Sequence, residues 1–315
     1  MVVPNWNGRR WLDGCLRSLS AQTLADHEVI VVDNGSGDGS LSYLAADHPQ
    51  VRVLALDANT GFAHAANVGI EAAAAELVAL VNTDVVLTPD WLERMTAALQ
   101  GDSATASVAC KMLQLADTAT IYDAGDVLRR DGACEQRGRF MVDDGRWDEG
   151  GEVFGACAGA ALYRRSAVLG VGGFDERYFA YLEDVDLALR LRLAGSRCRY
   201  EPAVAFHAGG ESSKRLPGGH HFLVTRNTLL LVVKSFPLRW LPIVVYRQLG
   251  WTWHALRERR LRAHLRAIAA ACWLMPGALR DRRRMLAAAR VPIEVAIPSR
   301  PFRGRHAAGH PSSFR

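Results

Sequence analysis

The chain opens with short apolar runs that alternate with stretches of helical periodicity. The apolar runs have the length and β-branched content of buried strands, and they fall at Val2–Pro4, Glu28–Asp33, Val51–Leu56 and Leu77–Val81. Between the first two runs, apolar residues from Trp11 to Leu19 recur at helical spacing, and an alanine-rich helix is expected over Phe62–Ala75. This βαβαβαβ order predicts an α/β domain with a mostly parallel central sheet flanked by helices.

The pattern changes twice further along the chain. Residues 115–155, rich in Asp, Gly and Arg, predict an irregular excursion. A second αβ section then runs from Gly159 to His207. It contains a helix that has Leu182 on its apolar face and ends at Gly195, and a short strand that ends at His207. We therefore expect one domain over residues 1–225, with halves at about 1–110 and 111–225.

Beyond residue 225 the apolar runs are interrupted by Lys, Arg and Pro. None reaches the ~20 apolar residues that a membrane-spanning helix needs. The segment Arg257–Met275 is basic and has an apolar face, and the region contains several Trp residues, a type favoured at lipid headgroups. This pattern over residues 226–297 favours a helical, basic region that lies on a membrane surface. The alternative is a helical lid packed on the core. Residues 298–315 are expected to be disordered.

The charge distribution separates the same two regions. Apolar residues make up 49% of the 315 and charged residues 23%, as in ordinary globular proteins. The net charge of +5 combines about +15 in residues 226–315, where eighteen Arg or Lys face three acids, with about −10 in residues 1–225. An acidic half suits metal and diphosphate chemistry, and a basic, apolar half suits a phospholipid leaflet or a nucleic acid.

The six cysteines are scattered, with no CxxC pair. This arrangement predicts neither a disulfide framework nor a cysteine-rich zinc site. A reducing, cytoplasmic environment fits it best.

Two glycine-containing loops follow predicted strands and could contact a ligand. The strand that ends at Asp33 leads into a polar turn, and ligands of parallel sheets bind beyond the carboxyl ends of strands, so Asp33 could accept hydrogen bonds from a base or ribose. Gly61 would let the backbone approach a ligand, and the helix behind it offers free N–H groups to phosphate. The alternatives are a turn-forming aspartate and a plain helix start.

Asn82 and Asp84 interrupt an apolar stretch directly after the strand Leu77–Val81. Residues two apart on a strand point the same way, so this pair could hold one hard cation. Mg²⁺ or Mn²⁺ that bridges a diphosphate needs only one or two protein carboxylates, and Asp84 is the stronger ligand. A simple turn is the alternative.

Three further positions carry chemistry. Glu183 and Asp184 begin a helix whose apolar face points into the core, which leaves both acids at the rim of a cleft. A carboxylate there could deprotonate an alcohol. The alternative is that these acids only stabilise the helix dipole. His207 could complete a metal site with Asp84 or contact a diphosphate, although a strand-end histidine is commonly a surface or capping residue. Arg226 could clamp a diphosphate.

In this order and at these separations, the clusters resemble the GT-A glycosyltransferases of family 2, especially the rhamnosyltransferase-like branch that builds bacterial surface glycans. The resemblance covers roughly residues 1–230. Its matching stretches are VPNWNG at 3–8, VIVVDNGSGDGS at 29–40, NTGFAHAANVGI at 59–70, LVNTD at 80–84, GGFDERYFAYLEDVDLALR at 172–190 and the segment around His207.

The resemblance implies a GT-A fold and assigns roles to residues. Asp184 of the Glu183-Asp184 pair would be the catalytic base, and Asp84 the acid that binds Mg²⁺ or Mn²⁺, with His207 as a second ligand. Asn82 stands where the family has the first acid of its DxD-type motif, which would weaken metal affinity. The residues expected to contact the nucleotide sugar are Pro4, Asn5, Asn7, Asp33, Asn34, Gly61, Phe62, Asn67, Asn82 and Arg226.

The implied reaction is a single in-line displacement that inverts the sugar's anomeric carbon and needs no covalent enzyme intermediate. The branch suggests rhamnose from dTDP-rhamnose as donor, with galactose, glucose or N-acetylhexosamine as alternatives, and a glycan or polyprenyl-linked acceptor. The expected location is the cytoplasmic face of the plasma membrane, with peripheral attachment.

Two other functions were weighed. A sugar-nucleotide nucleotidyltransferase should carry a Gly-rich, basic phosphate loop after the first strand, where this chain has Asn5-Trp-Asn-Gly-Arg-Arg10. A nucleic-acid-binding protein that uses the Arg-rich C-terminus would leave Asp33, Asp84 and Asp184 without a role. We therefore expect no nucleic-acid partner.

Overall fold

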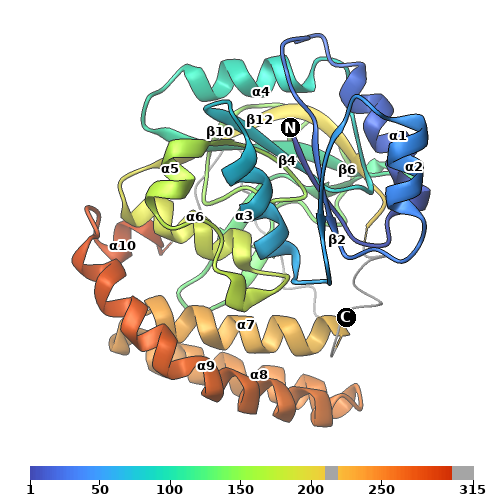
Figure 1. Ribbon diagram of the computed structural model, residues 1–315. Coiled ribbons are helices and arrows are strands. Elements are labelled where there is room, and N and C mark those ends of the chain that lie inside the picture. Colours follow the sequence, from blue (N-terminus) through green and yellow to red (C-terminus); the bar gives the residue numbers. More distant parts are fainter. Residues whose placement is uncertain (210–218, 300–315) are drawn as a thin grey trace.

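A mixed ten-stranded sheet forms the centre of the computed structural model, which describes residues 1–209 and 219–299 (Figure 1). The path through the sheet is β10-β12-β6-β11-β4-β1-β2-β3, with β5 paired to β12 and β7 to β6. The strands are β1 (Val2–Asn5), β2 (Ile30–Asn34), β3 (Arg52–Leu56), β4 (Leu77–Val81), β5 (Val85–Leu87), β6 (Thr105–Gln114), β7 (Asp117–Asp123), β10 (Gly151–Val153), β11 (Ala160–Arg164) and β12 (Arg197–His207). A separate hairpin joins β8 (Asp126–Leu128) to β9 (Cys134–Gln136).

Alternating residues of the strands build a core on each face of the sheet. One core combines Val3, Val31 and Val81 with side chains of α1 (Arg9–Ser20), α2 (Ser40–Asp47) and α4 (Trp91–Gln100). The other combines Val2, Val32 and Leu80 with α3 (Phe62–Ala72), α5 (Arg165–Gly170) and α6 (Glu183–Leu193). Because side chains alternate along a strand, neighbouring residues of one apolar run serve opposite cores.

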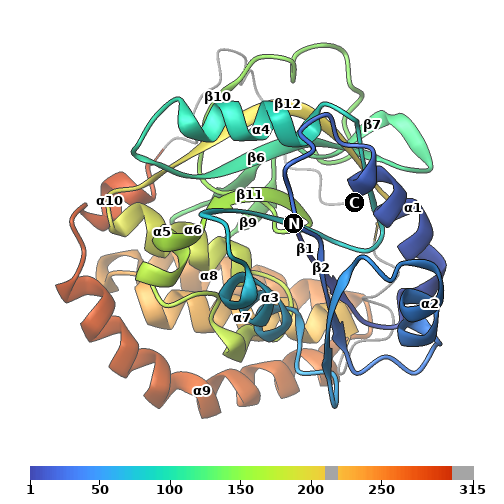
Figure 2. The same ribbon diagram turned by 45° about the horizontal axis from the view of Figure 1, so that its top comes forward.

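A third core attaches the C-terminal helices to α6. It joins Leu189 and Leu193 of α6 to Leu230 of α7, Trp240 and Ala278. Figure 1 and Figure 2 show the C-terminal helices packed together along one side of the domain. Their bounds are α7 (Gly219–Ser235), α8 (Leu241–Arg257), α9 (Leu261–Ala287) and α10 (Ile293–Ala296), with a 3-10 turn at Leu238–Trp240.

The structure confirms the α/β class and refines its details. The predicted strand Leu77–Val81 is β4, and the other three predicted strands are shifted by one or two residues at an end. The strands β4, β1, β2 and β3 are parallel, but β11 is antiparallel to both of its neighbours. The sequence does not indicate this direction, because a buried apolar run has the same pattern in a parallel and an antiparallel strand.

The prediction of an irregular excursion at 115–155 was wrong in part. This segment forms β7, β8, β9 and β10, and β7 joins the main sheet beside β6. In the C-terminal region, α7 begins at Gly219, a few residues before the predicted boundary at 226. Within residues 1–209 and 219–299, no helix is long and apolar enough to cross a membrane. The predicted disordered tail lies almost wholly outside the described residues.

Candidate donor site and catalytic carboxylates

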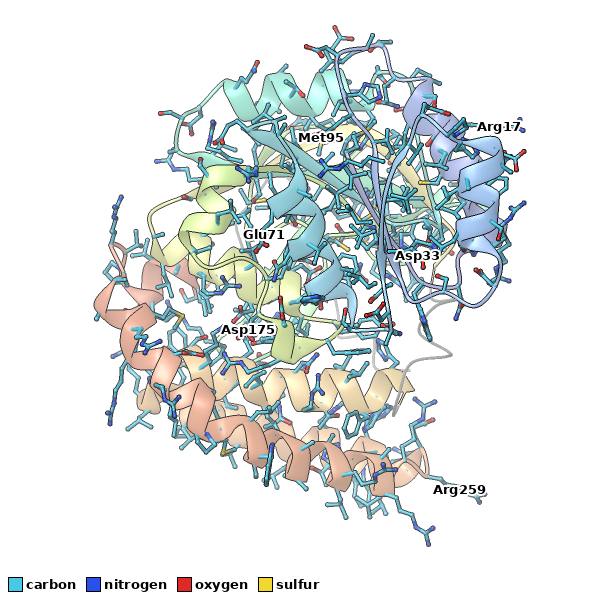
Figure 3. All side chains as sticks on the ribbon, viewed as in Figure 1. Arg17, Asp33, Glu71, Met95, Asp175 and Arg259 are labelled. Carbon is cyan, nitrogen blue, oxygen red and sulfur yellow. The ribbon has the colours of Figure 1, made fainter. Side chains whose placement is uncertain are left out.

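Asn5 pairs with Asp33 near the carboxyl ends of the parallel strands β1 and β2. Figure 3 labels Asp33. Both residues are fully buried, and the Asn5 amide donates to Asp33 Oδ2 at 2.7 Å. The backbone N–H of Ser36 donates to Asp33 Oδ1 at 2.9 Å. Asp33 therefore closes the turn after β2, as in the turn-forming alternative, and its contact with a nucleotide stays a prediction. Pro4 precedes Asn5 on the same strand and is partly exposed.

Two asparagines tie the neighbouring loops together. Asn7 accepts from the Gly37 N–H at 2.9 Å, which joins the loop after β1 to the loop after β2. Asn34 accepts from the N–H and the hydroxyl of Thr60 and donates to the Gly61 carbonyl, which joins the loop after β2 to the start of α3. In this structure both side chains position backbone of the site.

Gly61, Asn67 and Arg226 also face protein. Gly61 has a φ of +92°, and the position of a β-carbon there would lie 2.6 Å from the ring and carbonyl of Phe179. Its lack of a side chain thus admits Phe179 rather than a ligand. Asn67 makes two hydrogen bonds to the backbone of Phe174, and Arg226 donates to the carbonyl of Tyr178 at 2.6 Å.

Phe62 begins α3 directly behind Gly61. Its ring packs edge-on against Phe174. The Ala63 N–H of the first turn donates to the Phe179 carbonyl at 3.3 Å, so the helix start is capped in part by the chain itself.

The predicted metal ligands come together where β5 pairs with β12. His207 lies opposite Val85 in this pairing, and His207 Nε2 is 3.7 Å from Asp84 Oδ1. The space beside them depends on Gly159, where an added β-carbon would stand 3.5 Å from the Asn82 amide nitrogen and from His207 Nε2. The residues Asn82, Asp84 and His207 therefore lie close together after the end of β4.

The hydrogen bonding of His207 bears on its role. The Gly209 N–H donates to His207 Nδ1 at 2.7 Å, and the ring stacks on Tyr122. Burial lowers the pKa of His207, against the opposing effect of Asp84, so the ring is neutral near pH 7. A neutral ring that accepts at Nδ1 carries its proton on Nε2, and Nε2–H donates a hydrogen bond but does not bind a metal.

Asp84 alone has the chemistry of a metal-binding carboxylate in this set. The part of the chain that the structure describes contains no cluster of three or more His, Cys, Asp or Glu side chains arranged to hold a metal. A diphosphate-bound cation fits such a site, because phosphate and water oxygens supply most of its ligands.

Asp184 is hydrogen-bonded to Ala158, the residue that directly precedes Gly159. Its Oδ2 accepts from the Ala158 N–H at 3.2 Å, and the carbonyl of the next residue, Gly159, accepts from the Asn82 N–H at 2.8 Å. Its Oδ1 accepts from the Val185 N–H at 2.8 Å, which fixes the carboxylate at the start of α6. The segment 158–159 thus bonds to Asp184 and to the backbone of Asn82, two residues before Asp84, although the acids at 84 and 184 are a hundred residues apart in the chain.

Glu183 differs from Asp184 in its surroundings. The prediction placed both at the rim of a cleft, but Glu183 is buried, and among the described residues its Oε2 has no hydrogen-bond partner. Burial, and to a lesser degree the charge of Asp184, raises the pKa of Glu183 well above its ordinary value. Burial also raises the pKa of Asp184, but the Ala158 and Val185 amides oppose that shift. The Ala158 and Val185 amides thus favour the charged form of Asp184, whereas Glu183 Oε2 has no such donor among the described residues.

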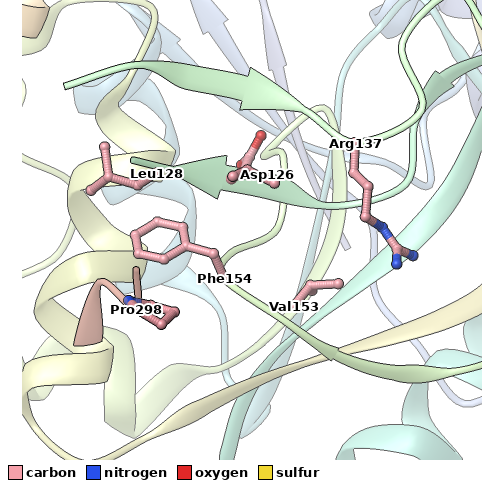
Figure 4. Close-up of a pocket in the computed structure, with 7 residues that line it drawn as sticks. Asp126, Leu128, Arg137, Val153, Phe154 and Pro298 are labelled. Carbon is pink, nitrogen blue, oxygen red and sulfur yellow. The ribbon is translucent and has the colours of Figure 1, made fainter. Parts of the chain in front are cut away.

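Sequence reasoning missed two buried acids next to this pair, Asp123 and Asp126. Burial raises the pKa of Asp123 to about 7, with Asp184 contributing, and burial also raises the pKa of Asp126 well above its ordinary value. The signal was the pair of acids in Asp123-Ala-Gly-Asp126, inside a segment that we expected to be irregular. A small pocket borders Asp126 and is also lined by Leu128, Arg137, Val153, Phe154 and Pro298 (Figure 4). It contains none of the predicted donor residues.

Comparison with known proteins finds glycosyltransferases. A protein of Mycobacterium tuberculosis (strain H37Rv), N-acetylglucosaminyl-diphospho-decaprenol L-rhamnosyltransferase, is 29% identical over 269 residues, or 76% of this chain and 87% of its own length. The Escherichia coli K12 rhamnosyltransferase WbbL is 57% identical over 53 residues, which cover 16% of this chain and 19% of WbbL.

Two solved glycosyltransferase structures share the fold. GalNAc-T7 with UDP, GalNAc and Mn²⁺ has a TM-score of 0.60 at 14% identity, covering 73% of this chain and 46% of its own. The Pyrobaculum calidifontis mannosyltransferase with GDP-Man and Mn²⁺ has a TM-score of 0.52 at 19% identity, covering 91% and 84%. Both are GT-A enzymes, as the sequence predicted for this chain. Because the model of glycosyl transferase family 2 also matches residues 1–171, more than half of the chain, this protein belongs to glycosyl transferase family 2.

Proposed function

We propose that the protein transfers a sugar from a nucleoside diphosphate donor to an acceptor hydroxyl, with inversion at the anomeric carbon. The observation that carries the proposal is the segment 158–159. Its Ala158 amide binds Asp184, and its Gly159 carbonyl binds the backbone of Asn82, two residues from Asp84. A base and a diphosphate site that share one short segment can act on the two sides of one sugar carbon.

Asp184 acts as the base. The Ala158 and Val185 amides donate to its two oxygens, which orients the carboxylate and favours its ionised form. Asp184 takes the proton of the acceptor hydroxyl while the acceptor oxygen attacks the anomeric carbon from the face opposite the nucleotide. The bond from that carbon to the diphosphate oxygen breaks, and nucleoside diphosphate leaves. A pKa above the ordinary aspartate range brings the base closer to neutral pH.

Asp84 would hold Mg²⁺ or Mn²⁺, with the Asn82 side chain next to it. When bound, such a cation neutralises the negative charge of the diphosphate. His207 Nε2–H, 3.7 Å from Asp84 Oδ1, would donate to a phosphate oxygen, which is the second of the two roles predicted for it. The Mn²⁺ named in the two solved glycosyltransferase structures supports a divalent cation.

The names of the relatives support a donor and an acceptor. The M. tuberculosis relative is named as a rhamnosyltransferase that acts on N-acetylglucosaminyl-diphospho-decaprenol. The donor that we propose for this protein is dTDP-rhamnose, and the proposed acceptor is a polyprenyl-diphosphate-linked glycan in cell-surface polysaccharide synthesis. Purified full-length protein would be incubated with dTDP-rhamnose and with UDP- and GDP-sugars, and nucleoside diphosphate release would be measured. Release from none of them, with acceptor present, would refute transferase activity.

The test of the mechanism is Asp184→Asn. We expect transfer to fall by about 10³-fold or more, in the range of removing a general base, with nearly unchanged affinity for the donor in calorimetry. Asp47→Asn, at an exposed acid of α2, is the control and should keep full activity. Equal loss of transfer and of donor affinity would contradict the role of Asp184 as base, and a product with retained configuration would contradict inversion.

We further propose that the C-terminal helices attach the enzyme to an anionic membrane surface. The exposed apolar side chains of α8 include Tyr246, Leu249 and Trp253, and Trp273 of α9 is 87% exposed. The region carries a large excess of Arg, so apolar insertion and attraction to anionic lipid act together.

Flotation with vesicles tests this attachment. The protein should float with vesicles that contain phosphatidylglycerol and much less with phosphatidylcholine alone. The double variant Leu249→Ser, Trp253→Ser should float less. Binding to duplex DNA with equal affinity in wild type and variant, without flotation, would favour the nucleic-acid alternative.

A further inference from the structure

The four residues before Glu183 form an unusual turn. Phe179, Tyr181 and Leu182 all have positive φ, at 64°, 71° and 67°. Residues with a side chain rarely adopt this region, and each such residue costs on the order of 1 kcal/mol or more. Three of them within four positions require strong support from the surrounding structure. Because Leu182 directly precedes α6, the shape of this turn sets where Asp184 points.

Helix α7 supplies that support through two consecutive residues. The Asn227 amide nitrogen donates to the carbonyls of Tyr178, Ala180 and Tyr181 at 3.0, 2.9 and 2.6 Å. The Arg226 guanidinium donates to the carbonyl of Tyr178 and, at 3.1 Å, to that of Arg177. Arg226 Nε also donates to Asn227 Oδ1 at 2.9 Å, which fixes the orientation of the amide.

The turn is held from its other side by the donor half of the domain. The Ala63 N–H of α3 donates to the Phe179 carbonyl, and the Phe179 ring fills the space beside Gly61. Beyond the turn, Lys234 lies two helical turns after Asn227 on α7 and pairs with Asp186 at 2.7 Å. Helix α7 thus binds the chain both before and after Asp184.

We propose that Asn227 is a positioning residue for the reaction: it holds the left-handed turn 179–182 in the shape that aims Asp184 at the acceptor hydroxyl. The inference rests on the proposed role of Asp184 as base. Asn227 is fully buried under the turn, and its amide faces three carbonyls of 178–181. It also links the C-terminal helices, which contain no predicted base or metal ligand, to the catalytic carboxylate.

Replacement by alanine separates positioning from donor binding. Asn227→Ala frees the turn to relax, and kcat should fall about 10- to 100-fold, because displacement of a reacting group by about 1 Å has an effect of this size. Donor affinity, measured by calorimetry with nucleoside diphosphate and Mn²⁺, should change less than about twofold, because Asn5 and Asp33 on β1 and β2 bond to each other and to Ser36, away from the turn.

A control on the same helix excludes loss of stability as the cause. Thr225 is also fully buried on α7, but its hydroxyl accepts from Trp251 of α8 instead of from the turn. Thr225→Val should lower the melting temperature while kcat stays within about twofold of wild type. If Asn227→Ala does not fold, Asn227→Ser, whose hydroxyl can donate one hydrogen bond, takes its place and should give an intermediate loss of kcat.

A second substitution, Leu182→Gly, tests whether kcat of the Asn227 variant can be restored. Leu182→Gly lowers the conformational cost of the turn, so in the Asn227 variant it should restore kcat several-fold, whereas in the wild type it should not raise kcat. Unchanged kcat in a folded Asn227 variant, or no rescue by Leu182→Gly, would overturn the inference. Transfer that survives in Asp184→Asn would instead refute the proposed base, so the two failures are distinguishable.

Discussion

Lys234 of α7 is buried and pairs with two carboxylates, Asp175 and Asp186, which precede and follow Asp184 in the chain. Its Nζ lies 2.7 Å from Asp175 Oδ2 and 2.7 Å from Asp186 Oδ1, and the lysine is almost fully buried. Arg177 and Arg190 each pair with one of the same acids. We consider Lys234→Met, which keeps the length of the side chain and removes its charge.

The structure sets the size of the effect. Breaking a buried ion pair by removing one partner typically costs 3–5 kcal/mol, because the remaining charge is left uncompensated. Each acid keeps one arginine, so we expect the lower end, about 3 kcal/mol, or roughly a 5–10 °C lower melting temperature. Burial raises the pKa of Asp186, but Arg190 and Lys234 outweigh it, and the net pKa is lowered. The acids are therefore ionised near pH 7, where the loss is largest.

Urea unfolding at pH 7 and at pH 4 measures this prediction. The difference between wild type and Lys234→Met should shrink as the pH falls, because protonation of an acid relieves the uncompensated charge in the variant. The double variant Asp186→Asn, Lys234→Met should be less destabilised than the sum of the single variants. An unfolding free energy within about 0.5 kcal/mol of wild type in Lys234→Met would refute the reasoning.

Three further predictions concern the acids and the metal position. Burial raises the pKa of Asp184, so kcat/KM should increase with pH through a midpoint above the ordinary aspartate value of about 4, and pH-rate profiles measure it. Burial raises the pKa of Asp123 to about 7, so the folded state keeps a proton that the unfolded chain releases near pH 4. Stability should therefore fall as pH rises from about 4 to 7, and Asp123→Asn should remove that part of the pH dependence in urea unfolding. Gly159→Ala would place a methyl group in ordinary contact with Asn82 and His207. The Mn²⁺ concentration for half-maximal activity should therefore rise several-fold, with little change in melting temperature. An unchanged Mn²⁺ concentration for half-maximal activity would place the cation elsewhere.

The local pattern of apolar and polar residues predicted much of the fold and several residues of the candidate site. Apolar runs placed the first four strands to within two residues, and polar residues directly after them marked Asp33 and Asp84 at strand ends. These predictions succeeded because the burial of a strand and the end of a helix are determined by a few neighbouring residues. Glu183 and Asp184 were recognised for the same reason, as acids at the start of an apolar helix.

The sequence by itself thus determined the α/β class, the family resemblance and the candidate acids. Only the tertiary structure decided what each polar side chain contacts. Asn67 and Arg226, predicted at the donor, bind backbone of residues 174 and 177–178, and Asn227, to which no role was assigned, holds the turn before Asp184. The physical reason is that a side chain's hydrogen-bond partners here lie about 50 to 110 residues away in the chain, whereas periodicity reports only which face of an element is buried.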